Sequence, residues 1–249
     1  MLRRIVELLR AIRRFFMSVK VIDSGNGGSG VVIINNLDES DYNKQRDNKR
    51  YPLETCGPTS MAMALLQAGH SIPIKLGEDP ADTITTFLTS ERYYEKMYRI
   101  LGTQETQWKP FNIHALLTEG VNELLGEKVS RFRTDWDFLG ILFNIVRGGG
   151  AVLSGDFTLP DGRELGHMVS LAGFRTKQRN IMDVRSPSEI DLKLVESFII
   201  DDPYGDWHTG YNDHHGNNIE FSPTNFNNIF RVQKNMLKKW AHLVRAGGK

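Results

Sequence analysis

The spacing of apolar residues changes between the first and second halves of the chain. In the first half they fill helix-length segments, such as the apolar run Met61–Leu66, which lies between the helix-start residue Pro58 and the helix-stop residue Gly69. The expected helices span about residues 58–68, 81–101, 111–125 and 135–147. Later the apolar and β-branched residues come in short runs between turn residues, which is typical of strands. The expected strands span residues 31–34, 151–157, 167–174 and 197–201. Helices first and strands second indicate an α+β fold.

The N-terminal segment has a pattern of its own. Its apolar residues fall three or four positions apart, at Leu2, Ile5, Val6, Leu9, Ile12 and Phe16. Arginines fill most of the other positions, so we expect a basic amphipathic helix over residues 1–18. Residues 1–16 would either contact an anionic membrane surface or pack on the domain. Met17 leaves open a third reading, in which translation starts there.

The arginines also interrupt the apolar run that a cleaved signal peptide needs. We therefore expect a cytoplasmic protein, or one that reaches the cell envelope without a cleaved leader. The Gly/Ser stretch at residues 24–30 is typical of a flexible loop and lacks the spacing of a phosphate-binding loop. The expected organisation is a helix at 1–18, a linker with a short strand at 19–40, and one domain at 41–249.

The composition is that of an ordinary globular protein. Of 249 residues, 40% are hydrophobic and 24% are charged, and the formal net charge is +1. A charge so near zero gives no reason to expect a nucleic-acid partner. No apolar run reaches the ~18–20 residues that cross a bilayer. The single cysteine, Cys56, excludes an internal disulfide and zinc sites built from several cysteines.

Cys56 stands where its thiol can become reactive. The string Cys-Gly-Pro-Thr-Ser leads directly into an apolar helical run, and Pro58 is a helix-start signal. The free N–H groups and the dipole of a helix N-terminus stabilise a thiolate, which is the nucleophilic form of cysteine. Gly57 leaves room for a substrate backbone. The competing interpretation is an inert thiol in the core.

A base for this thiol has to come from elsewhere in the chain. Among the histidines, His167 opens a predicted apolar strand after a turn, a position that holds an imidazole at the rim of a sheet. The next strand ends in Asp201 and Asp202, either of which can orient the ring by accepting its second N–H. Successive strand residues face opposite sides, so only one of the two aspartates can do so.

These three segments, in this order, resemble the papain-like peptidases related to the bacteriocin leader-processing, double-glycine peptidases. The resemblance covers about residues 41–230 and rests on Cys-Gly-Pro-Thr-Ser, on Gly-His-Met-Val-Ser-Leu-Ala-Gly-Phe and on Ile-Ile-Asp-Asp-Pro-Tyr-Gly. It implies a papain-like fold, with a helical lobe and an antiparallel β-sheet. It also implies a cysteine peptidase that acts on peptides and needs no cofactor.

The resemblance assigns roles to individual residues. It implies that Cys56 is the nucleophile, that His167 is the base and that Asp202 orients the histidine. A glutamine upstream of the cysteine serves the oxyanion hole in this family, and Gln45 matches it, with Asn48 as the alternative. For the substrate we consider peptidoglycan stem peptides cut by a lysin-like endopeptidase. Peptide maturation, transpeptidation and a catalytically silent peptide-binding module are the alternatives.

A second cluster of polar residues follows the third motif. Its possible metal ligands are Asp206, His208, Asp213, His214 and His215. Histidine and carboxylate ligands suit zinc, although the cluster lacks a helical His-Glu-x-x-His pattern, and we expect no metal. The aromatic residues nearby, Tyr204, Trp207 and Tyr211, can instead shape a substrate groove.

Overall fold

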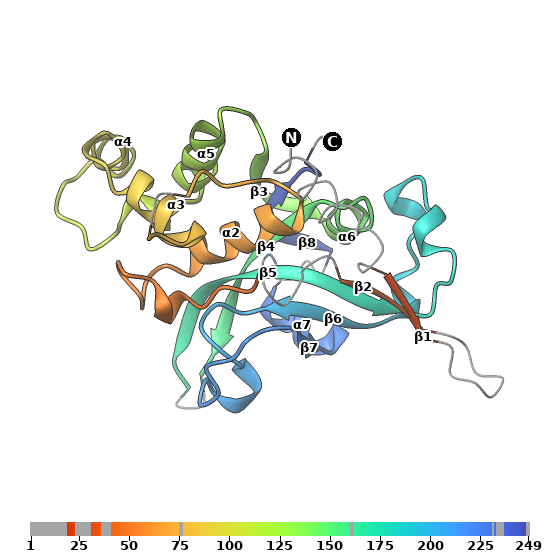
Figure 1. Cartoon of the computed structure of the whole chain (residues 1–249). Helices are drawn as coiled ribbons and strands as arrows, with labels where there is room; N and C mark the ends of the chain where they lie inside the picture. The colour runs from red at the N-terminus through yellow and green to blue at the C-terminus, as the bar shows by residue number, and fades with distance from the viewer. Residues whose placement is uncertain are drawn as a thin grey trace.

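The computed structural model describes residues 19–22, 31–35, 41–74, 77–159, 162–230, 232 and 237–247. The helix expected over residues 1–18 and the Gly/Ser stretch at 24–30 lie outside these described residues. The predictions made for those two segments therefore stay predictions. The described part combines a helical lobe with an antiparallel sheet (Figure 1).

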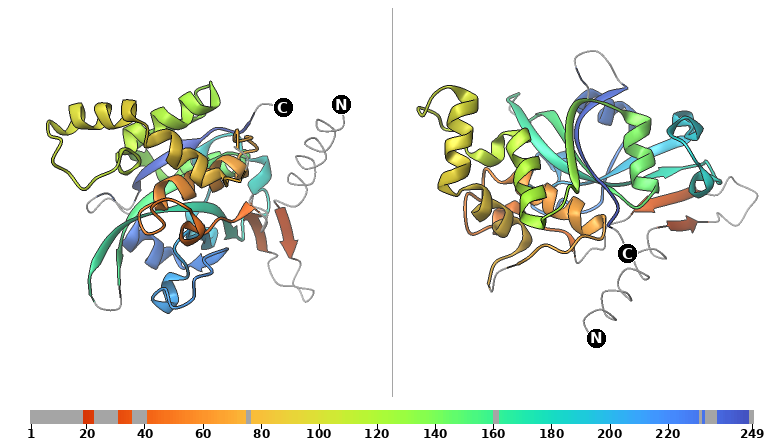
Figure 2. Two further views of the ribbon diagram at one scale, coloured as in Figure 1. Left: turned by 60° about the vertical axis from the view of Figure 1, so that its left-hand side comes forward. Right: turned by 90° about the horizontal axis from the view of Figure 1, so that it is seen from above.

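Six α-helices lie in the described part of the chain. They are α2 (Cys56–Gln67), α3 (Pro80–Leu88), α4 (Glu91–Leu101), α5 (His114–Leu125), α6 (Phe138–Val146) and α7 (Pro223–Ile229). The first four gather in a lobe at one side, and α6 and α7 pack on the sheet (Figure 2). Within the described residues, no helix is long and apolar enough to span a membrane.

Among the described residues the sheet has eight strands, and every pairing is antiparallel. They are β1 (Val19–Ile22), β2 (Val31–Asn35), β3 (Ser130–Asp137), β4 (Gly150–Thr158), β5 (Glu164–Thr176), β6 (Val195–Asp201), β7 (Ile219–Phe221) and β8 (Lys238–Val244). The order is β1-β2-β5-β4-β8-β3, while β6 pairs with β5 and β7. The long strand β5 carries His167 on a stretch that pairs with β4, before the stretch that pairs with β2 and β6.

Alternate residues of the central strands feed two separate cores. On β4, Val152 joins the helical lobe, whereas Ala151 and Leu153 face a core shared with α6 and α7. On β5, Met168 packs with the helical lobe and Val169 with the other core. Side chains alternate along a strand, so these contacts cover both faces of the sheet. A strand that is buried on both faces needs apolar residues at nearly every position, as the sequences of β4 and β5 have.

The α+β fold predicted from the sequence is confirmed. The single helix expected at 81–101 is wrong in detail, because the chain breaks between α3 and α4, where Ser90 adopts an extended conformation as the N-cap of α4. Strand β8 was not anticipated. Its inward-facing Lys239 is fully buried, with Nζ donating to Asn227 Oδ1 at 3.3 Å and lying over the Phe138 ring. A lysine at a core position hides the alternation that marks a strand.

The helix that begins with Cys56 lies directly against the backbone of β4. A Cβ added at Gly150 would come within 2.2 Å of the Ala64 carbonyl oxygen, which belongs to the α2 backbone and cannot rotate away. We expect Gly150→Ala to lower the free energy of unfolding by about 1–3 kcal/mol, as overpacking does. Gly140→Ala in α6 is the control, since the nearest atom to a Cβ added at Gly140 is 3.9 Å away. Equal urea midpoints for the two variants would contradict this prediction.

Candidate active site

Helix α2 begins at Cys56 and is tied to β5 immediately beyond His167. Ser60 Oγ, one turn into the helix, donates to the Met168 carbonyl at 2.9 Å. Gly57 packs closely against the same strand, with its Cβ position 3.2 Å from Met168 Sδ. These contacts place a partly buried Cys56 beside His167.

His167 lies between the cysteine and an aspartate. The residue is 3% exposed, and its Nε2 lies 2.8 Å from Asp202 Oδ1. The His167 side chain is also hydrogen-bonded to the Cys56 thiol, which receives a further hydrogen bond from the Met168 N–H. With Nε2 engaged by Asp202, Nδ1 is the nitrogen that faces Cys56. The structure thus brings together the three residues singled out from the sequence.

The contacts among Cys56, His167 and Asp202 change the pKa values of the thiol and the imidazole. Burial alone lowers the pKa of His167, but the charge and hydrogen bond of Asp202, together with Cys56, outweigh burial and raise that pKa to about 10. Burial alone raises the pKa of the Cys56 thiol, but the hydrogen bond and charge of His167 outweigh it and lower that pKa below its usual value. Both shifts favour a thiolate–imidazolium pair.

Asp202 is completely buried and is held by three donors. Besides His167, the Tyr204 N–H donates to Oδ1 at 2.9 Å, and the Tyr211 hydroxyl donates to Oδ2 at 3.3 Å. Tyr211 is buried and has a positive φ of 64°, which is rare for a residue with a side chain. Burial and the neighbouring Asp202 raise the pKa of Tyr211 far above its usual value, so the hydroxyl remains a donor. The sequence marked Tyr211 as an aromatic of the groove but carried no signal for this hydrogen bond.

Asp201 points away from the histidine. Its Oδ1 accepts the Asn218 N–H at 2.7 Å, and its Oδ2 has no hydrogen-bond partner among the described residues. Burial first, and then the charge of Asp202, raise the pKa of Asp201 to about 7. Of the two aspartates left open by the sequence, Asp202 is therefore the one that contacts His167.

The two candidate oxyanion residues have different environments. Gln45 lines the cleft with Cys56; its Nε2 donates to the Pro52 carbonyl at 3.1 Å, which leaves a second N–H on that nitrogen. Asn48 Nδ2 donates to Thr55 Oγ1 at 2.7 Å and to Thr59 Oγ1 at 2.9 Å, so both of its amide hydrogens are used. The geometry favours Gln45 over Asn48.

A cleft of about 660 Å³ opens over the cysteine and the histidine. The helical side contributes Leu53 and Glu54, and the β4–β5 hairpin contributes Leu159, Arg163 and Leu165. Tyr204 and Tyr211 also line it, as expected for groove-forming aromatics, whereas Trp207 stacks on Phe221 outside the lining. The cleft is large enough for several residues of an extended peptide.

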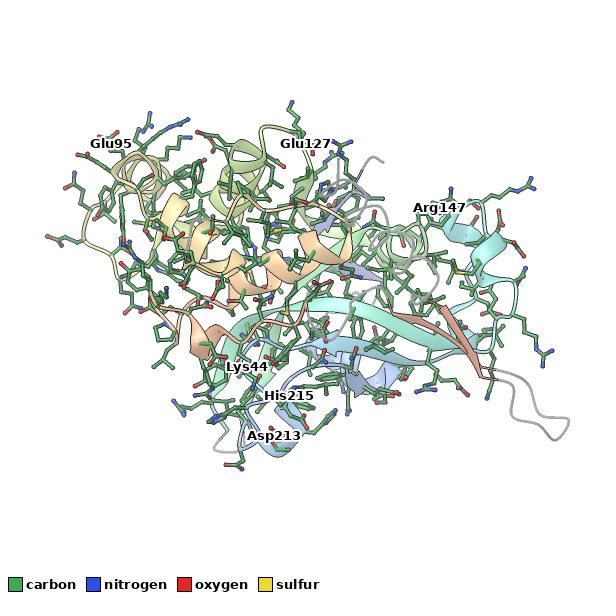
Figure 3. All side chains as sticks on the ribbon, in the orientation of Figure 1. Lys44, Glu95, Glu127, Arg147, Asp213 and His215 are labelled. Atoms are coloured by element: carbon green, nitrogen blue, oxygen red, sulfur yellow. The ribbon has the colours of Figure 1, made fainter. Side chains whose placement is uncertain are left out.

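The histidines and aspartates beyond β6 do not converge. Asp213 and His215 lie in the loop that follows this strand (Figure 3), where Asp213 Oδ1 accepts the His215 N–H at 2.8 Å. His208 Nε2 is 3.0 Å from the Glu220 carbonyl, and the His215 ring contacts Tyr42. Among the described residues, no three side chains of His, Cys, Asp or Glu form a metal-binding group. The metal interpretation of this cluster therefore has no geometric support.

In this structure a helical lobe carries a cysteine at a helix N-terminus, and the facing sheet carries a histidine and an aspartate. This arrangement defines the papain-like class of cysteine-peptidase folds. The comparison with known families is consistent with that class. Residues 37–232 match the Peptidase C39 like family, and the chain belongs to this family. No curated protein matches the chain.

The position of Gln45 leads to a mutational prediction. If its free N–H stabilises an oxyanion, Gln45→Ala should lower kcat for a cleaved peptide by on the order of 100-fold, with a much smaller change in KM. Asn48→Ala is the comparison, because its amide hydrogens are already occupied within the protein. It should affect the unfolding midpoint more than turnover. A larger loss of kcat in Asn48→Ala than in Gln45→Ala would reverse the assignment.

Proposed function

We propose that this member of the Peptidase C39 like family hydrolyses peptide bonds through a triad of Cys56, His167 and Asp202. The observation that carries the proposal is the continuous row of hydrogen bonds from the thiol through the imidazole to a buried carboxylate, at the floor of a cleft. A structural cysteine in a core needs neither the charged partner nor the opening to solvent.

The proposed reaction proceeds through a thioester. The Cys56 thiolate attacks the peptide carbonyl carbon, and the oxygen takes up the negative charge beside the Gln45 amide and the N–H groups at the start of α2. Protonated His167 gives its proton to the departing amine as the C–N bond breaks. His167 then takes a proton from water, which attacks the thioester and restores the thiolate and a carboxylic acid.

For the substrate we propose a peptide, with peptidoglycan stem peptides as the first candidates. The support for a cell-envelope substrate is the basic amphipathic pattern of residues 1–16, which lie outside the described residues. Peptide maturation is the second candidate, and it is supported by the family's link to leader-processing peptidases.

The test is incubation of the purified protein with peptidoglycan and, separately, with a peptide library, followed by mass spectrometry of the products. New peptide termini support hydrolysis, and release from peptidoglycan identifies the envelope substrate. Products joined to an added amine indicate a transpeptidase instead. If no product forms in either mixture and an electrophile does not label Cys56 at neutral pH, the result favours a catalytically silent peptide-binding module.

A further inference from the structure

Arg46 is held rigidly at the edge of the candidate active site. Its Nε–H donates to the Tyr204 carbonyl at 3.1 Å, and its guanidinium carbon lies 3.8 Å from the centre of the Tyr204 ring. The preceding residue fixes the same junction, because the Gln45 N–H donates to the Pro203 carbonyl at 2.9 Å. Two neighbouring residues therefore dock this short turn onto the segment that follows Asp202.

The charge of Arg46 has no partner within the described part of the protein. The described carboxylates all lie beyond ion-pair distance, and its hydrogen bonds there use only Nε. The side chain is half-buried and lines the same cleft as Cys56 and Gln45. A guanidinium that is fixed by stacking, yet keeps its Nη donors for an outside group, is prepared to bind a carboxylate as a two-pronged donor.

The other charged residues of the cleft lining are few. Arg163 adds a second positive side chain to the lining, and Glu54 is the acidic residue of the described lining. Glu54 is exposed and is not paired with Arg46. A bound carboxylate would be attracted to Arg46 and repelled by Glu54.

We propose that Arg46 binds a carboxylate of the substrate, so that the protein prefers peptides with an acidic group close to the bond that is cleaved. The carboxylate can be an aspartate or glutamate side chain, or the free C-terminus of a short peptide. This inference rests on the proposed peptidase function and adds the chemical class of its substrate.

The experiment uses three peptides of one sequence that the full-length protein cleaves. The first has Glu near the cleaved bond and an amidated C-terminus, the second has Gln there and a free C-terminus, and the third has Gln and an amidated C-terminus. We expect kcat/KM to be about 10- to 100-fold higher for one of the first two than for the third. The peptide with the advantage identifies the source of the carboxylate.

Arg46→Gln should remove this advantage, so kcat/KM should fall about 10- to 100-fold more for the charged peptide than for the uncharged third peptide. Arg46→Lys should keep part of the advantage of the charged peptide, because the positive charge remains but the planar guanidinium with its two parallel donors is lost. Arg147→Gln is the control: this exposed arginine follows α6, on the opposite side of the molecule from His215 (Figure 3). The advantage of the charged peptide should also weaken as salt rises.

Two results would overturn the inference while leaving the peptidase proposal intact. One is equal kcat/KM for all three peptides. The other is an equal fall for charged and uncharged peptides in Arg46→Gln, which would mean that Arg46 acts only by supporting Tyr204 and the neighbouring Asp202. Absence of cleavage of every peptide would instead count against the proposed function itself.

Discussion

Cys56→Ala is expected to lower kcat/KM for any cleaved peptide by on the order of 10,000-fold or more. In the proposed reaction, the variant removes the atom that forms the thioester, and the remaining groups can only position water and stabilise an oxyanion. Binding of the peptide should change little, because the thiol contributes a small part of a cleft whose other lining is unchanged. The measurements are turnover by mass spectrometry and peptide affinity by calorimetry.

The control for this variant is its fold. The hydrogen bond from Ser60 to the Met168 carbonyl still ties α2 to β5 without the thiol, so the thermal midpoint of Cys56→Ala should stay close to that of the wild type. The chain has one cysteine, so labelling by iodoacetamide reports on Cys56 alone. The labelling rate should exceed that of a free thiol at neutral pH, since the pKa of Cys56 is lowered. Wild-type turnover in a folded Cys56→Ala protein would end the cysteine-peptidase proposal.

Sequence reasoning singled out Cys56 and His167 because each stands in a local pattern with its own physical reason. Cys56 precedes a helix-start proline, and His167 opens an apolar strand, so a short window of sequence contains the whole signal. Pairing of Asp202 with His167 depends on β6 lying beside β5, which the order of the strands made plausible. In each of these cases the pattern and the later geometry agree.

The contacts that sequence reasoning missed are those that depend on tertiary structure alone. Whether Gln45 or Asn48 reaches the cleft depends on Thr55 and Thr59, which occupy both amide hydrogens of Asn48. The hydrogen bond from Tyr211 to Asp202 needs a residue with positive φ, and no local pattern announces that conformation at a tyrosine. Which polar side chains form hydrogen bonds with one another depends on which of them the tertiary fold brings together. The spacing of these residues along the sequence does not predict those pairs.

The second large effect on turnover is expected from substitution of Asp202, and its neighbour Asp201 provides the comparison. We expect Asp202→Ala to lower kcat by on the order of 1,000-fold, near the upper end for a residue that supports a base, because it leaves His167 buried with a polar nitrogen unpaired. Asp202→Asn keeps the shape but removes the charge that raises the pKa of His167 to about 10. It should therefore retain partial activity, with the alkaline limb of the pH–rate profile moved to lower pH.

Asp201→Asn is the matched variant, one residue away in the chain. The new amide oxygen can still accept the Asn218 N–H, so kcat should stay within about threefold of the wild type. Stability should respond in a different way. Because the folded state raises the pKa of Asp201 to about 7, it binds a proton that the unfolded chain releases, and wild-type stability falls as pH rises from about 4 through 7. Asp201→Asn removes that loss, so its advantage in thermal midpoint should grow with pH over the same interval. The opposite ranking, with Asp201→Asn severe for kcat and Asp202→Asn mild, would show that the other aspartate supports the histidine during catalysis.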